Sequence, residues 1–229
     1  WPLADTRAAL SAAGIEILSG MMEMAGEDYS SLESIRETGG VRPAETWAVN
    51  LAAAAGNAQV AEQLGLDLVT FHAGFLPHEA GDPERQVMIE RLRTIAEVFA
   101  EHGVAVAFET GQESAETLVE VLEAVGRDDV GVNFDPANMI LYAMGDPVAA
   151  LTRLAPFVRQ IHVKDALPTT EPGTWGTEVP VGEGAVDWPA FLAAAAEHAP
   201  RARLVIEREA GEQRATDVRT AVRFLESLA

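Results

Sequence analysis

Five short apolar runs of the sequence end on a side chain that can bind a metal ion. These side chains belong to His72, Glu109, Asp135, His162 and Glu207. Carboxylate oxygens are the ligands that Mg²⁺ and Mn²⁺ prefer, and an added imidazole shifts the preference toward Mn²⁺, Co²⁺, Fe²⁺ or Zn²⁺. Glu109, Asp135, His162 and Glu207 together offer three carboxylates and one imidazole, which predicts a site for one divalent metal ion. Each of the four, taken alone, is also consistent with a capping or loop role.

The pentad Ile-His-Val-Lys-Asp at residues 161–165 adds a second basic residue to this set. Side chains alternate between the two faces of a strand, so His162 and Lys164 are expected to face the same way. Lys164 is the only lysine in the chain. We expect both residues at the site. The pattern leaves one alternative open, a hydrogen-bonded histidine at a strand end beside a solvated lysine.

The elements that must position these residues alternate along the chain. Strands are predicted at residues 15–22, 67–74, 104–110, 130–135, 157–165 and 203–209. Helices are predicted at residues 5–13, 43–64, 82–102 and 114–125, from residue 146, and at 187–198 and 217–228. Asp82, Ser114 and Asp187 are typical N-cap residues, and Gly65 and Gly126 are typical of helix C-termini. The polar segments 23–42 and 167–184 are predicted to be long loops.

Repetition of strand, loop and helix predicts an α/β fold with a parallel sheet and helices outside it. No Gly-rich phosphate loop follows any predicted strand, so a dinucleotide-binding open sheet is disfavoured. In a TIM (β/α)8-type barrel the strand-end residues would converge at the C-terminal face, where that fold places its chemistry. We therefore predict one TIM-barrel domain over residues 1–229. Six strands are found where a barrel needs eight, so the first strand-helix-strand portion is expected to be missing from this chain.

Composition limits the classes of partner. The 16 Lys and Arg residues face 36 Asp and Glu residues, giving a formal net charge of −20, which repels nucleic acid and anionic lipid surfaces. The absence of cysteine excludes disulfides and thiolate chemistry and fits a reducing compartment. No apolar run has the length of a membrane span, and no signal-peptide pattern begins the sequence. We expect a cytoplasmic protein that binds a small molecule, with no nucleic-acid or membrane partner, and leave homo-oligomerisation open.

Several motifs together resemble the xylose isomerase-like divalent-metal TIM barrels, a family of sugar isomerases, epimerases, inosose dehydratases and endonuclease IV-type nucleases. The resemblance covers about residues 67–229 through FHAG, AFET, NFDPAN, IHVKD, VPVGEGAVDW and VIERE. It implies that Glu109, Asp135, His162 and Glu207 bind the metal and that the two glutamates also act as an acid/base pair. It also implies that His72 contacts substrate, or a second metal ion in the nucleases of the family.

The activity that this resemblance implies is isomerisation or epimerisation of a sugar or polyol ketone through an enediolate, which metal coordination would stabilise. Asn138, Lys164 and Trp175 are further candidates for substrate binding, Lys164 at a developing oxyanion and Trp175 against a sugar face. Surface exposure of Lys164 and loop packing of Trp175 stay open as alternatives.

Three alternatives to an isomerase stay open or are disfavoured. An inosose-type dehydratase would use the same scaffold, and a non-catalytic metal- or sugar-binding barrel would need no acid/base pair. A trinuclear nuclease is disfavoured for two reasons. Asn138 replaces the histidine that such enzymes have three residues after the aspartate, and the late loop offers only Glu178-Val179-Pro180 in place of Asp-x-His.

Overall fold

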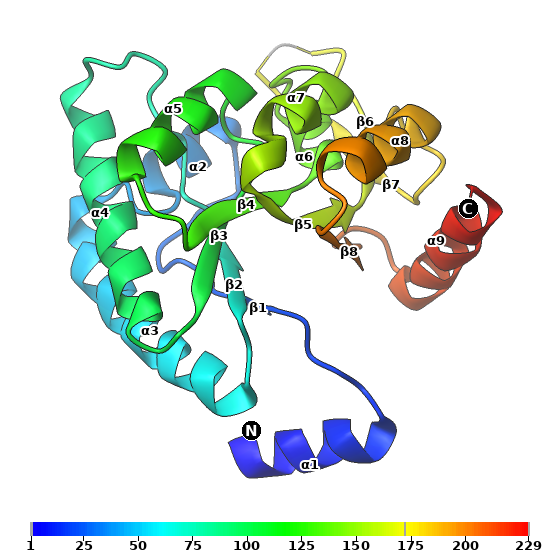
Figure 1. Cartoon of the computed structure of the whole chain (residues 1–229). Helices are drawn as coiled ribbons and strands as arrows, with labels where there is room; N and C mark the ends of the chain where they lie inside the picture. Colours follow the sequence, from blue (N-terminus) through cyan, green and yellow to red (C-terminus); the bar gives the residue numbers. More distant parts are fainter. Residues whose placement is uncertain (1, 172, 229) are drawn as a thin grey trace.

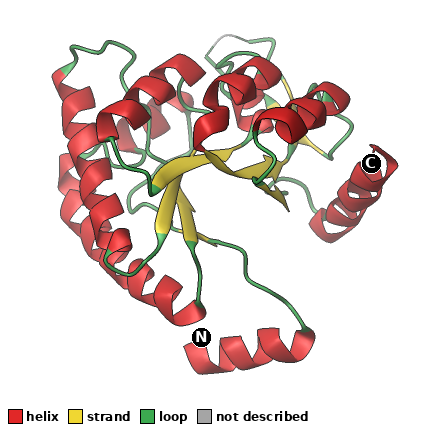
Figure 2. Cartoon of the chain, in the orientation of Figure 1, coloured by secondary structure: helices red, strands yellow, loops and turns green. Residues whose placement is uncertain are grey.

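Six parallel strands form the sheet at the centre of the computed structural model, which describes residues 2–171 and 173–228. The strands are β1 (Gly20–Met21), β2 (Leu68–Phe71), β3 (Ala105–Glu109), β4 (Val130–Phe134), β5 (Val158–Val163) and β8 (Arg203–Ile206). They are hydrogen-bonded in the order β1-β2-β3-β4-β5-β8. The sheet is curled, and helices cover its outer side (Figures 1 and 2). This half-barrel confirms the predicted TIM-barrel class.

Register brings the carboxyl ends of the strands to one edge. Phe71 pairs with Phe108, Glu109 with Asn133, and Phe134 with Ile161. Because every pair is parallel, the residues that follow the strand ends gather on the same side of the sheet. The sheet therefore positions a site at its C-terminal edge.

The helices of the described chain are α1 (Leu3–Ala13), α2 (Leu32–Thr38), α3 (Ala44–Leu64), α4 (Pro83–Ala100), α5 (Ala115–Val125), α6 (Pro136–Leu141), α7 (Pro147–Leu154), α8 (Trp188–His198) and α9 (Arg214–Leu228). As expected, the side chains of Asp82, Ser114 and Asp187 cap α4, α5 and α8. Burial of Phe71, Phe108 and other apolar side chains between sheet and helices drives this packing. No helix in residues 2–171 or 173–228 has the length and apolar character needed to cross a membrane.

Three local predictions are wrong. Within segment 15–22 only the two residues of β1 form a strand, because only Gly20 and Met21 pair with β2. Ile15 lies outside the sheet and is 57% exposed. Segment 23–42 contains α2, capped by the Ser31 hydroxyl, which accepts a hydrogen bond from the Ser34 backbone N–H. Segment 167–184 contains β7 (Thr177–Val179), which pairs antiparallel with β6 (Asp165–Leu167). A short helix, α6, begins directly after Asp135, in a stretch to which the sequence pattern assigned no element.

Candidate metal and substrate site

Four side chains converge at the C-terminal edge of the sheet. Glu109 ends β3, Asp135 follows β4, His162 lies in β5 and Glu207 follows β8. Each offers one ligand atom, and these four atoms all lie within 4.8 Å of one another. Glu109, Asp135 and His162 are buried, while the side chain of Glu207 is 19% exposed. The structure thus brings together all four residues that the sequence predicts as metal ligands.

The imidazole of His162 lies among the three carboxylates. Its Nδ1 is 3.2 Å from Glu207 Oε2, 3.5 Å from Glu109 Oε1 and 3.5 Å from Asp135 Oδ2. Burial alone would lower the pKa of His162, but the carboxylates of Asp135, Glu109 and Glu207 raise it to about 12. Without a metal, a proton on His162 therefore offsets part of the negative charge, and a bound cation would have to replace that proton.

Orphaned polar atoms show that the residues fit a cation. Within the described residues, His162 Nδ1 and Asp135 Oδ2 are buried and make no hydrogen bond. Buried polar atoms are rarely left without a partner, since each costs roughly 1–3 kcal/mol. Three carboxylates and an imidazole are a donor set that suits a divalent ion. Both orphaned atoms would gain a partner if such an ion were bound between them.

Neighbouring side chains hold the carboxylates in place. Asn138 Nδ2 donates to Glu109 Oε1 over 2.9 Å, and Asn133 Nδ2 donates to Glu109 Oε2 over 3.2 Å. Asp135 Oδ1 accepts the Asn138 backbone N–H over 3.0 Å as the cap of α6, which leaves Oδ2 to face the cluster. Burial would raise the pKa of Glu109, but His72 and His162 lower it, so this group is held as a carboxylate.

Lys164 is a buried part of the cluster. It is 2% exposed, which rules out the surface-lysine alternative. Its Nζ lies 3.0 Å from Glu207 Oε2 and 3.6 Å from Asp135 Oδ2, and it also pairs with Glu209. Burial would lower the pKa of Lys164, but the charges of Asp135, Glu207 and Glu209 raise it. The side chain is therefore an ammonium ion beside the candidate metal site.

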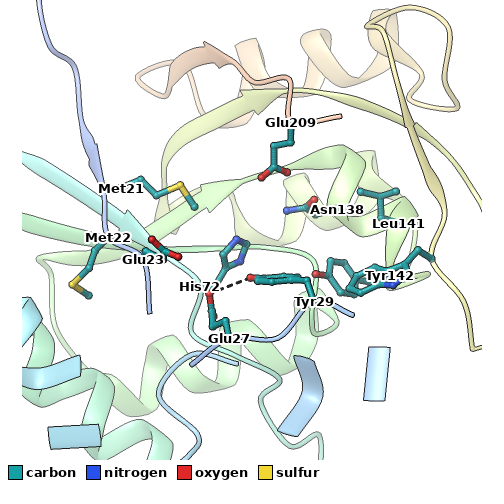
Figure 3. Close-up of a pocket in the computed structure, with 11 residues that line it drawn as sticks. Met21, Met22, Glu23, Glu27, Tyr29, His72, Asn138, Leu141, Tyr142 and Glu209 are labelled. Atoms are coloured by element: carbon teal, nitrogen blue, oxygen red, sulfur yellow. Dashed lines mark hydrogen bonds between the residues drawn. The ribbon is translucent and has the colours of Figure 1, made fainter. Parts of the chain in front are cut away.

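A cavity of about 510 Å³ opens next to the cluster, and Figure 3 shows the residues that line it. Its lining residues are Met21, Met22, Glu23, Glu27, Tyr29, His72, Asn138, Leu141, Tyr142, Trp175 and Glu209. His72 and Asn138 connect cavity and cluster, since His72 Nε2 lies 4.0 Å from Glu109 Oε1 and Asn138 donates to the same atom. Three of the four predicted substrate residues, His72, Asn138 and Trp175, thus line one space. The fourth, Lys164, donates to Asn138 Oδ1 over 3.4 Å.

Sequence reasoning missed several lining residues. Tyr29 and Tyr142 are the only two tyrosines of the chain, and both line the cavity. Glu209 lies two residues beyond Glu207, so alternation along an extended chain could have placed both on one face. Tyr29 belongs to the segment 23–42, whose path the sequence pattern did not predict.

Comparison with known proteins shows a family match along nearly the whole chain. Residues 2–228 match the family described as xylose isomerase-like TIM barrel. Two curated relatives match shorter stretches. The uncharacterized protein YihM of Escherichia coli K12 is 31% identical over 100 residues, which are 43% of this chain and 30% of YihM. The 3-dehydroshikimate dehydratase of Bacillus anthracis is 32% identical over 121 residues, which are 46% of this chain and 43% of that protein. The matches therefore span less than half of either relative.

Solved structures share the fold. A xylose isomerase domain protein from Planctomyces limnophilus is 37% identical, with a TM-score of 0.94, and the match covers 99% of this chain and 82% of that one. A xylose isomerase-like TIM barrel protein from Mycobacterium smegmatis in complex with magnesium is 19% identical, with a TM-score of 0.74, covering 99% and 77%. An L-ribulose 3-epimerase is 15% identical, with a TM-score of 0.66, covering 100% and 84%. The latter two similarities concern the fold alone.

Proposed function

This chain belongs to the xylose isomerase-like TIM barrel family, and from that premise we propose that it is a divalent-metal-dependent isomerase or epimerase of a sugar or polyol ketone. The observation that supports the proposal most is the convergence of Glu109, Asp135, His162 and Glu207 on one point beside a cavity large enough for a small molecule. The L-ribulose 3-epimerase of the same fold is consistent with this activity.

In this proposal the four converging residues hold one ion, which is Mn²⁺, Mg²⁺ or Co²⁺ by preference and Zn²⁺ or Fe²⁺ as alternatives. When bound, the ion would polarise a ketone and its neighbouring hydroxyl and so acidify the adjacent C–H bond. The magnesium complex of the protein from Mycobacterium smegmatis is compatible with a hard divalent ion on this scaffold.

The two glutamates then move the protons. Glu207 has the more accessible carboxylate, 19% exposed against 1% for Glu109. Its pKa is lowered, because His162 and Lys164 together outweigh the effect of burial, so its carboxylate is ready to accept a proton from carbon. In an epimerase, Glu109 would first take up a proton from water in the cavity, because it is a carboxylate at rest, and would then deliver it to the opposite face of the enediolate. Transfer between neighbouring carbons would instead give isomerisation.

Lys164 stabilises negative charge during this transfer. Its ammonium group lies 3.0 Å from Glu207 Oε2 and 3.4 Å from Asn138 Oδ1, a lining residue of the cavity. A fixed positive charge in a buried site favours an enediolate oxygen without reorganisation. Asn138 and His72 orient the substrate through its hydroxyl groups, and Trp175 packs against its apolar face.

A second candidate is a dehydratase on the same scaffold, favoured by the similarity to the 3-dehydroshikimate dehydratase of Bacillus anthracis. In that reaction the same α-proton is removed, and a hydroxide leaves from the neighbouring carbon. Lys164 would then donate a proton to the departing oxygen. The product of a dehydratase is lighter than its substrate by one water, whereas an isomerase or epimerase conserves mass.

The test is exchange of substrate protons with solvent. The purified protein is stripped with a chelator, reloaded separately with Mn²⁺, Mg²⁺, Co²⁺ or Zn²⁺, and incubated in D₂O with a library of ketopentoses, ketohexoses and cyclic polyol ketones. We expect at least one compound to gain deuterium at the α-carbon only with metal, with its product identified by NMR and mass spectrometry. Tight metal binding without exchange in any compound would favour a non-catalytic barrel instead.

A further inference from the structure

We propose that the substrate is electrically neutral, a sugar or polyol ketone without phosphate or carboxylate, and that Glu23 and Glu209 exclude anionic analogues. This inference rests on the proposed function and specifies its substrate class. Three features of the cavity support it: acidic lining side chains, nearby basic side chains that are already paired, and aromatic walls.

The charged side chains that line the cavity are mostly acidic. Of the titratable lining residues, three are carboxylates, Glu23, Glu27 and Glu209, and the others are His72, Tyr29 and Tyr142, whose phenols stay neutral because their pKa values are raised. In Figure 3, Glu209 and Glu23 approach the space between them from different parts of the chain. The three carboxylates of the candidate metal site would be balanced by a divalent ion together with Lys164. Glu23 and Glu209 then leave the cavity with a net negative charge, which opposes an anionic ligand.

The basic side chains nearest the cavity are already paired with carboxylates. None of the lining residues in the described chain is an arginine or lysine. Lys164, the nearest ammonium group, is paired with Glu207 and Glu209. Arg208 precedes Glu209, but its guanidinium forms ion pairs with Glu178 at 2.7 Å and Asp217 at 2.9 Å. Recognition of phosphate or carboxylate normally uses a free arginine or lysine fork.

The N-termini of the helices near the cavity do not provide a substitute binding site for an anion. The helix nearest the cluster, α6, has Asp135 as its N-cap, so a carboxylate already occupies that end. The N-terminus of α2, in the segment that contributes Tyr29, is capped by the Ser31 hydroxyl. The Asp135 carboxylate therefore repels an anion at the first of these positions, and the Ser31 hydroxyl already accepts the Ser34 backbone N–H at the second.

The walls of the cavity suit a neutral sugar. Tyr142 and Trp175 pack edge to face with ring centroids 5.0 Å apart, and Tyr29 lies 6.5 Å from Trp175. Aromatic rings with Met21 beside them offer an apolar surface for the C–H face of a sugar or cyclic polyol. Carboxylates at the rim offer hydrogen-bond acceptors to its hydroxyl groups.

The experiment compares matched pairs of ligands with the metal-loaded protein. Each neutral ketose or cyclic polyol ketone is paired with its phosphate ester or its carboxylated analogue. Binding is measured by calorimetry, and α-carbon exchange is measured in D₂O. We expect the neutral member to bind and to exchange better by about tenfold or more, since one like-charge contact near a protein surface has this magnitude. The difference should shrink at high salt, because Glu209 is an exposed side chain.

A double variant, Glu23→Gln with Glu209→Gln, removes the proposed source of discrimination. The affinity ratio between neutral and anionic members should fall toward one. Glu123→Gln with Glu226→Gln removes the same charge from exposed positions of α5 and α9, outside the cavity lining, and should leave the ratio unchanged.

The outcomes separate this inference from the function on which it rests. Metal-dependent exchange that is faster in a phosphorylated or carboxylated compound overturns the neutral-substrate inference while the isomerase proposal stands. An unchanged ratio in the double variant overturns the role of Glu23 and Glu209. Absence of exchange and of binding for every pair, with each metal, overturns the proposed function and this inference with it.

Discussion

The Nδ1 atom of His162 lies 3.5 Å from Oδ2 of Asp135, and neither atom makes a hydrogen bond within residues 2–171 and 173–228. Buried polar atoms are rarely left without a partner, and both atoms would gain one if the cluster coordinated an ion. The cluster also includes Glu109 and Glu207, so its occupant would be a cation rather than a water molecule.

Metal binding should stabilise the fold. A ligand that binds only the folded state contributes about 2.7 kcal/mol at a concentration of 100 times its Kd. For a domain of this size that amounts to a rise in Tm of about 5–10 °C. The measurement is thermal unfolding of chelator-treated protein with and without Mn²⁺. Asp135→Asn removes one proposed ligand charge, and an equal rise in Tm for that variant would contradict the assignment.

Lys164 should be needed for activity and for the stability of the metal-free protein. Lys164→Met keeps an unbranched apolar side chain of nearly the same length but leaves Asp135, Glu207 and Glu209 without their ammonium partner. Loss of one member of a buried ion pair costs about 3–5 kcal/mol. We expect such a loss in urea unfolding without metal, a smaller loss with Mn²⁺, and a fall in kcat of about a hundredfold. A variant with unchanged kcat would show that Lys164 is structural only.

Much of this site could be predicted because its residues follow strands with clear apolar patterns. His72, Glu109, Asp135, His162 and Glu207 could each be placed by the strand before them, since parallel strands end at one edge. The burial of Lys164 could not be predicted from the strand pattern. A lysine at a strand end is exposed unless several carboxylates surround it, and here those carboxylates come from other elements.

The short helix and strands within the two segments predicted as long loops could not be predicted from the sequence either. Helix α2 has seven residues and the β6-β7 hairpin has strands of three, lengths at which tertiary contacts outweigh local propensity. The hairpin forms around Asp165. Its carboxylate accepts hydrogen bonds from the backbone N–H groups of Ala166, Gly182, Gly184 and Val186 and from Trp188 Nε1. Periodic patterns of apolar residues do not predict hydrogen bonds between residues that lie this far apart in the sequence.

Asp165→Asn should therefore destabilise the 177–188 segment. The amide that replaces one oxygen would face N–H donors, so buried donors lose their acceptor. We expect a loss of about 2–4 kcal/mol in urea unfolding. Glu183→Gln, an exposed position in the same segment, is the matched control and should stay within about 0.5 kcal/mol of the parent protein. Equal stability of the two variants would contradict the role of Asp165.

Glu113 should make stability depend on pH. Burial raises the pKa of Glu113 from 4.5 to about 8, and its side chain is 3% exposed. The folded protein keeps this proton between those two pKa values while the unfolded chain loses it. The contribution to stability is therefore present below pH 4.5 and is lost as pH rises toward 8.

Glu113→Gln should remove this pH-dependent loss of stability, because glutamine does not ionise. The variant should unfold with a free energy similar to the parent at pH 4.5 and higher than the parent at pH 8 by a few kcal/mol, since each unit of pKa change corresponds to about 1.4 kcal/mol. Glu116→Gln, at an exposed position of α5, controls for the loss of a charge. A pH-independent difference between Glu113→Gln and the parent would show that Glu113 ionises freely in the folded state.

The most direct test of the metal-dependent acid/base site is turnover in Glu109→Gln and Glu207→Gln, measured as α-carbon deuterium exchange beside metal content. Glutamine keeps a carbonyl oxygen that can still contact a metal but cannot accept the substrate proton. We predict that both variants fold, bind metal when it is supplied well above their weakened affinity, and lose about a thousandfold or more of the exchange rate, as expected when a proton-transfer group is removed. Exchange at more than a tenth of the parent rate in either variant, with metal bound, would contradict that residue's role as a proton carrier.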